Sequence, residues 1–163
     1  MSDRDRLRLL RAQLEEDFRF IHYCSKRHSD MVARASSTSD REMATMAIAY
    51  LLHNLYTAIE NYMVRIAKQF ENTLEDSSWH RELIERMKIE IPGLRPAVIS
   101  SELEEPLDEL RRFRHLFRNV YKSELKPSRV NEVSDIAAAI EENLAERHKR
   151  FVSWLDELIA AEE

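Results

Sequence analysis

Glycine occurs only once in this chain of 163 residues, and proline occurs four times. The backbone therefore has few natural breakpoints, while the plentiful Glu, Leu, Arg and Ala, which favour helix, fill most windows. This composition predicts an all-α protein. Because 44% of the residues are hydrophobic, a chain of this length can bury a sizeable core, and we expect one domain over residues 1–163.

Apolar residues recur at three- and four-residue steps, which is the spacing of an amphipathic helix. Ser39 and Glu42 have the spacing of a capping box at a helix start, and Asp76 to Ser78 offer caps for a short third helix. Pro127 breaks the helix that precedes it. The predicted helices cover residues 3–35, 39–72, 79–88, 101–126 and 129–161. Long helices joined by short loops favour an antiparallel bundle of four to five helices.

The charge and cysteine content narrow the classes of function. The net charge is -5, so any binding of nucleic acid must come from a local basic patch. Cys24 is the only cysteine, which excludes an internal disulfide and a zinc site built from cysteines. With one glycine the chain has no glycine-rich phosphate loop, and we expect no cofactor and no metal. No segment resembles a signal peptide or a membrane span, so we expect a cytoplasmic protein.

Residues 111–121, RRFRHLFRNVY, form the most informative stretch. At about 100° per residue, the predicted helix places its apolar side chains in one band. Arg114, Arg118 and Tyr121 lie along one edge of that band, and His115 and Asn119 lie together further round. Arg111, Arg112 and Lys122 extend the positive zone.

Two interpretations of this patch remain open. The arginines can lay their stems on the core and pair with acids on neighbouring helices. Alternatively they bind phosphate, because the planar guanidinium matches phosphate through paired hydrogen bonds better than lysine does.

The stretch FRHLFRNVY resembles the signature of the HEPN superfamily, and more narrowly of its HepT-like branch. That signature is an arginine, a polar residue, three further residues, a histidine, one residue and a tyrosine (RX4HXY). Arg114 takes the place of the arginine, His115 of the polar residue and Tyr121 of the tyrosine, while Asn119 stands where the family has histidine. Residues 52–68, 78–87 and 95–100 also resemble that branch in order and spacing.

The resemblance implies a HEPN-like helical bundle that forms a homodimer, with the arginine-histidine segments of both subunits lining one cleft. Many members are endoribonucleases that need no metal. The HepT-like branch resembles the toxin of a toxin-antitoxin pair whose other half is a nucleotidyltransferase, which can attach AMP to the tyrosine. The resemblance together with the basic patch gives the candidate site residues: Arg114, Asn119 and His115 for catalysis, Arg111, Arg118 and Lys122 for RNA or phosphate, and Tyr121 for modification.

Asn119 departs from the family pattern at the general base. An amide has no useful proton affinity near neutral pH, and loss of a general base costs about 10²- to 10⁴-fold in rate. The chain is therefore expected to be an impaired nuclease or a binder, either because the natural protein has lost catalysis or because the sequence is an engineered inactive form. A third alternative is that His115 takes over as the base.

Other polar residues have weaker claims. His53, Tyr56 and Glu60 share one helix face, which suggests either a metal or acid-base site or an ordinary rim, and the resemblance adds Asn54 to that face. His80 is interpreted as a packing or capping residue, and AERHKR, residues 145–150, as a solvated face. Two further functions remain open: a non-enzymatic HEPN adaptor that holds a nucleotidyltransferase or its substrate, and a plain helical scaffold.

Overall fold

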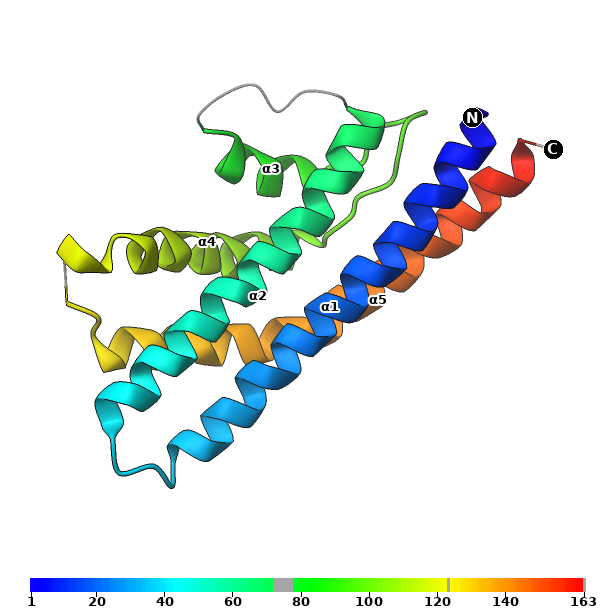
Figure 1. The fold of residues 1–163 in the computed structure, drawn as a ribbon. Helices are drawn as coiled ribbons and strands as arrows, with labels where there is room; N and C mark the ends of the chain where they lie inside the picture. The colour runs from blue at the N-terminus through cyan, green and yellow to red at the C-terminus, as the bar shows by residue number, and fades with distance from the viewer. Residues whose placement is uncertain (72–77, 123, 163) are drawn as a thin grey trace.

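The computed structural model describes residues 1–71, 78–122 and 124–162, and the described residues are almost entirely helical. The α-helices and two 3-10 turns follow one another in this order: α1 Asp3–Ala35, α2 Arg41–Phe70, α3 Trp79–Met87, η1 Ser101–Leu103, α4 Glu104–Arg118, η2 Val120–Lys122 and α5 Pro127–Ala161. The predicted all-α bundle of four to five helices is confirmed (Figure 1).

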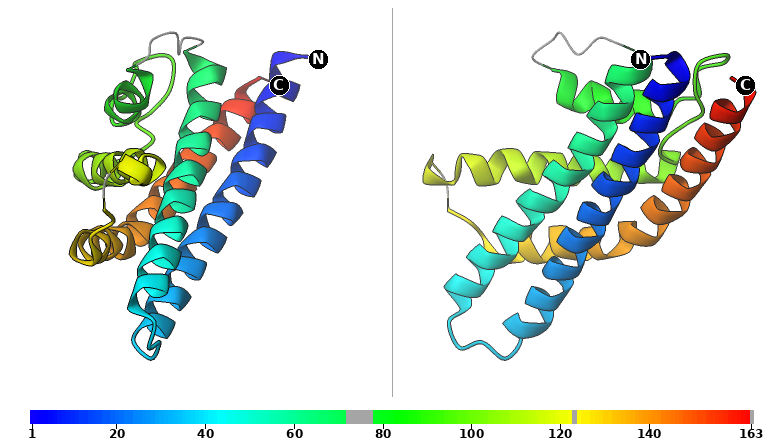
Figure 2. Two further views of the ribbon diagram at one scale, coloured as in Figure 1. Left: turned by 60° about the vertical axis from the view of Figure 1, so that its left-hand side comes forward. Right: turned by 45° about the vertical axis from the view of Figure 1, so that its right-hand side comes forward.

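Helix α2 is the central element, since it contacts each of the other four α-helices. It runs antiparallel to α1, and α4 crosses it steeply on another side (Figures 1 and 2). The first part of α5 lies beside α4, and its last part runs beside α1 (Figure 2). The two ends of the chain therefore lie close together, where Arg11 Nε donates to Asp156 Oδ1 at 2.6 Å.

The apolar stripes predicted from the sequence form the core. In α2, the residues at these steps that are buried include Ile48, Leu52, Leu55, Ile59, Met63 and Ile66. Leu107, Leu110 and Phe113 of α4 are also fully buried against them, whereas Phe117 is only partly buried and Val120 is exposed. The apolar band of α4 thus fades toward its C-terminal end.

Local sequence explains most helix boundaries. Ser2 and Asp5 form a capping box at the start of α1. For α2, the prediction of Ser39 as the cap was wrong: Asp40 is the N-cap and its side chain accepts from the Met43 amide at 3.0 Å. Ser78 precedes α3 but makes no capping bond with its side chain, and the other suggested caps, 76 and 77, lie outside the described residues.

Helix α4 ends at Arg118, eight residues before the predicted end at Lys126. Asn119 is the C-cap, and its side-chain Nδ2 donates to the carbonyl of His115 at 2.8 Å. This bond occupies one of the carbonyls that a helix end leaves free, and residues 120–122 continue as a 3-10 turn. The prediction failed because it relied on proline as the helix breaker.

The segment between α3 and α4 is fixed by one buried arginine. Gly93 has a φ of 77° in the turn of this segment, a conformation that glycine adopts without strain. The side chain of Arg95 is 0% exposed and is paired with Glu71 at the end of α2. Its guanidinium also donates to the carbonyls of Arg86, Ile89 and Pro96. This network anchors the segment to α2 and α3.

Candidate functional site

The predicted basic segment lies at the C-terminal half of α4 and packs along α2. Three side chains of α2 face it at successive turns: His53, Thr57 and Glu60. Arg118 Nε donates to His53 Nε2 at 3.2 Å, and Arg114 Nη1 lies 3.5 Å from Thr57 Oγ1. The α2 face of His53 and Glu60, which was predicted to be either a site or an ordinary rim, is thus the surface that contacts Arg114 and Arg118.

Arg114 is buried at the centre of this contact. Its side chain is 5% exposed, and its Nη2 donates to Glu60 Oε2 at 2.8 Å, where the carboxylate is 7% exposed. The guanidinium also lies over the ring of Tyr56, 4.6 Å from the centroid. Arg114 was predicted to lie at the edge of the apolar band, whereas a carboxylate and an aromatic ring enclose it in the structure.

His80 of α3 completes this cluster. Its Nδ1 lies 2.8 Å from Glu60 Oε2 and 3.4 Å from Arg114 Nη2. The Trp79 ring stacks on the imidazole with centroids 3.7 Å apart. His80 was predicted to be a packing or capping residue, and its contact with Glu60, which lies 20 residues earlier in the chain, was not predicted.

The remaining arginines of the segment are largely neutralised by acids of α4 itself. Arg111 Nε donates to Asp108 at 2.7 Å, and Arg112 pairs with Glu105 at 2.9 Å and also with Glu109. The interpretation that arginines pair with acids holds for these two, although the partners are on the same helix. Among the described residues, none of the acids forms an ion pair with Arg118 or Lys122.

His53 of α2 and His115 of α4 differ in their burial and in their hydrogen bonds. His53 is partly buried, and desolvation lowers its pKa below the ordinary value, with a smaller opposing effect from its hydrogen bond with Asn54. Its Nε2 accepts from Arg118, so its basic nitrogen is occupied. His115 is exposed on the outer face of α4.

Tyr121 is the most exposed tyrosine of the described part, at 77%. It lies in the 3-10 turn after α4, and the Lys122 ammonium is 5.4 Å from its ring centroid. Tyr56, by contrast, is fully buried, and desolvation raises its pKa. The ring of Tyr121 therefore projects into solvent.

An apolar groove of about 840 Å³ borders the end of α4. Its walls come from the first turns of α2, the end of α4 and the start of α5, and include Met46, Tyr50, Phe117 and Val120. Met46 and Tyr50 are more than half exposed. Val120, which lines this groove, immediately precedes Tyr121 in the chain.

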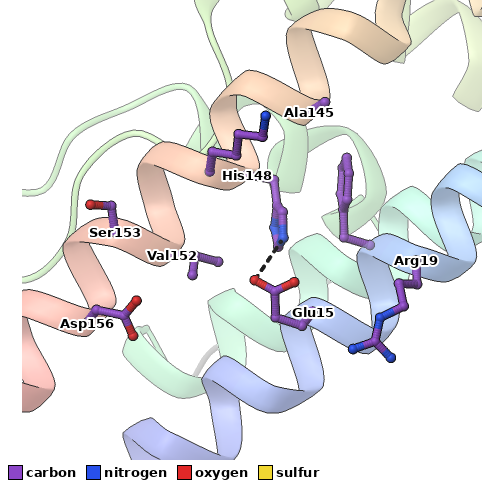
Figure 3. A pocket seen from close by; sticks show the side chains of 9 residues that line it. Glu15, Arg19, Ala145, His148, Val152, Ser153 and Asp156 are labelled. Carbon is purple, nitrogen blue, oxygen red and sulfur yellow. Dashed lines mark ion pairs between the residues drawn. The ribbon is translucent and has the colours of Figure 1, made fainter.

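A second pocket, of about 450 Å³, lies between α1 and α5 (Figure 3). His148 lines it, with Nε2 3.5 Å from Glu15 Oε1 and Nδ1 2.9 Å from the Tyr62 hydroxyl. His148 is buried, so the interpretation of AERHKR as a solvated face was wrong at this position. Asp156, at the far end of the pocket, is already paired with Arg11.

Neither a membrane span nor a metal cluster is found in the described part of the chain. None of its helices combines the length and the apolar character needed to cross a bilayer. Likewise, no group of three or more His, Cys, Asp or Glu side chains in residues 1–71, 78–122 and 124–162 has a metal-binding arrangement.

The described helices form an all-α bundle in which the Arg-X4-Asn-X-Tyr segment packs along the central helix, the architecture expected of a HEPN-type protein. The sequence model of a family described as HepT-like protein matches residues 47–155, which include α3, α4, most of α2 and α5, and the cluster of Glu60, His80 and Arg114. The chain belongs to this HepT-like family. No curated protein matches it at a significant level, and neither does any solved structure.

Proposed function

We propose that this protein is the toxin component of a toxin-antitoxin pair, that it acts on RNA as a homodimer, and that a nucleotidyltransferase antitoxin neutralises it by transferring AMP to Tyr121. The observation that carries the proposal is the 77% exposure of Tyr121 at the end of the motif helix. In the transfer, the phenol oxygen attacks the α-phosphate of ATP, pyrophosphate leaves, and the phenolic proton passes to a base of the partner enzyme.

The charges around Tyr121 support both halves of the proposal. Arg118 and Lys122 have no acidic partner among the described residues and can bind the phosphates of RNA. A phosphodiester on Tyr121 adds negative charge beside them, so it competes for the same cations. One modification can therefore reduce RNA binding without unfolding the protein.

A dimer is proposed because one subunit presents an incomplete site. Arg118 and His115 lie three residues apart near the end of one helix, about 60° apart around it, so a single copy offers one guanidinium and one exposed imidazole. In the proposed dimer, a two-fold axis beside α4 places Arg118 and His115 of the second subunit in the same RNA-binding cleft. Asn119 supplies no base, so we expect any RNA cleavage to be weak.

The test is intact-mass spectrometry after incubation with the antitoxin and ATP. We expect the mass of one adenylyl group on the natural chain and none on Tyr121→Phe. Tyr50→Phe is the matched control, because Tyr50 is also more than half exposed and lies on α2. Modification of Tyr121→Phe to the same extent contradicts the proposal.

A non-enzymatic adaptor is the second candidate, and the burial of Arg114 favours it. A guanidinium that is 5% exposed and paired with Glu60 cannot reach a phosphate without breaking that pair. RNA cleavage by Asn119→His separates the two functions. A gain in cleavage supports the toxin, whereas binding of the nucleotidyltransferase with no gain supports the adaptor.

A further inference from the structure

The cluster of Glu60, His80 and Arg114 joins three helices around one carboxylate oxygen. Glu60 Oε2 lies 2.8 Å from Arg114 Nη2 and 2.8 Å from His80 Nδ1. Two of the three side chains are buried, at 7% and 5% exposure, but the imidazole is 37% exposed. The ring of His80 therefore has one edge against a buried carboxylate and another edge open to solvent.

This arrangement fixes which nitrogen of His80 is basic. An ionised carboxylate beside a guanidinium only accepts hydrogen bonds, so the Nδ1 of His80 carries the proton that it donates to Glu60. Nε2 then keeps its lone pair, and no contact of Nε2 is found among the described residues. Stacking on Trp79 restricts rotation of the ring. A carboxylate that orients an imidazole and stabilises its protonated form is the arrangement used in general-base catalysis.

The other nitrogen bases near α4 are less suited to this role. Asn119 is an amide that already donates to a backbone carbonyl. The Nε2 of His53 accepts from Arg118. His115 is exposed, and no described side chain orients its ring. Of the described histidines that border α4, His80 alone has its Nδ1 on a carboxylate and no contact at Nε2.

Building on the proposed function, we propose that His80, oriented by Glu60, is the catalytic base for the residual RNA cleavage of this chain. Nε2 takes the proton of a ribose 2′-hydroxyl, and the 2′-oxygen bonds to the adjacent phosphorus. The bond from phosphorus to the 5′-oxygen breaks, leaving a 2′,3′-cyclic phosphate. The 5′-oxygen takes a proton from water, and the imidazolium returns its proton to solvent. Arg114 positions Glu60 by charge and makes no contact with RNA.

The inference is tested by single-turnover cleavage of a single-stranded RNA oligonucleotide, with the full-length protein in excess and a chelator present. His80→Gln keeps a donor for Glu60 but has no base, and we expect cleavage to fall by about 10²-fold or more. His80→Ala should lose cleavage to a similar extent and regain part of it when imidazole is added. A purely structural role for His80 predicts no response to imidazole.

His22→Gln is the matched control. His22 Nδ1 lies 2.7 Å from Glu141 Oε1, so it forms the same type of pair, but on α1 and α5. Cleavage by this variant should equal that of the natural chain, whereas a contaminating nuclease would leave cleavage unchanged in His80→Gln as well. Thermal unfolding of the His80 variants shows whether they are folded. If His80→Ala is unfolded, cleavage by His80→Gln decides the test.

The outcomes separate the inference from the proposed function. If the natural chain and His80→Gln cleave equally, the inference is wrong and the proposed function stands. The same holds if the natural chain is inactive while Asn119→His cleaves. If neither the natural chain nor Asn119→His cleaves RNA, both fall. Loss in both His80 variants, with imidazole rescue in His80→Ala, supports the inference.

Discussion

The buried pair between Glu60 and Arg114 should dominate the response of the protein to single charge changes. Glu60→Gln keeps the size of the side chain but leaves the guanidinium, which is 5% exposed, without a counter-charge. Removing one partner of a buried ion pair costs about 3–5 kcal/mol. For a protein of this size each kcal/mol lowers Tm by about 2–4 °C, so we expect a decrease of about 6–20 °C.

The control is an exposed ion pair that also joins an arginine to a carboxylate. Arg11 and Asp156 are joined by two hydrogen bonds, at 2.6 and 3.2 Å, but their side chains are 39% and 49% exposed. Asp156→Asn should therefore cost about 0–1 kcal/mol. Thermal and urea unfolding followed by far-ultraviolet circular dichroism measures both variants under one condition.

A double variant shows whether the cost comes from the unpaired charge. Combining Glu60→Leu with Arg114→Met replaces both charges by apolar groups, and most of the stability lost in Glu60→Gln should return. Equal changes in Tm for Glu60→Gln and Asp156→Asn would refute the view that Arg114 is held as a buried ion pair.

The remaining predictions concern acid, the loop and salt. Desolvation lowers the pKa of both His28 and His148, so the unfolded chain takes up protons first and stability should fall as the pH drops below the ordinary 6.5; urea unfolding between roughly pH 7.5 and 5.5 should show this, and His28→Gln should reduce it. Arg95→Lys cannot replace the buried guanidinium fork and should cost about 2–4 kcal/mol, measured by urea unfolding; a cost below about 1 kcal/mol would contradict the network. If Arg118 and Lys122 bind RNA, affinity should fall steeply with added salt and Ala at both positions should flatten that dependence by about 1–2 units of log-log slope; titrations that show no change would exclude them.

The helices were predictable because each has a local cause. Periodic apolar residues marked α1, α2 and α5, and the predicted start of the last helix at residue 129 lies two residues after the observed start at Pro127. The end of α4 was not predictable in the same way, because an asparagine side chain bonded to a carbonyl four residues earlier decides it. Asparagine competes with the helix through local hydrogen bonds, which is the signal that was available.

The sequence pointed to the segment that packs along α2, but not to the burial of Arg114 within it. A helical wheel places Arg114 at the border of the apolar band, and only a partner on another helix decides whether it is solvated or enclosed. That partner, Glu60, lies 54 residues away, and the third member, His80, lies on a third helix. Sequence spacing relates residues within one helix, so it found the α2 face and missed the connection.

Asn119 gives one position two separate effects. Its backbone ends α4 and its side-chain Nδ2 donates to the His115 carbonyl, and by its resemblance to the HEPN signature it stands where a histidine is expected. Asn119→His adds an imidazole but also removes the hydrogen bond from the Asn119 side chain to the His115 carbonyl, next to the turn that carries Tyr121. Asn119→Ala removes the same hydrogen bond without adding an imidazole. The activity of Asn119→His should therefore be compared with that of Asn119→Ala.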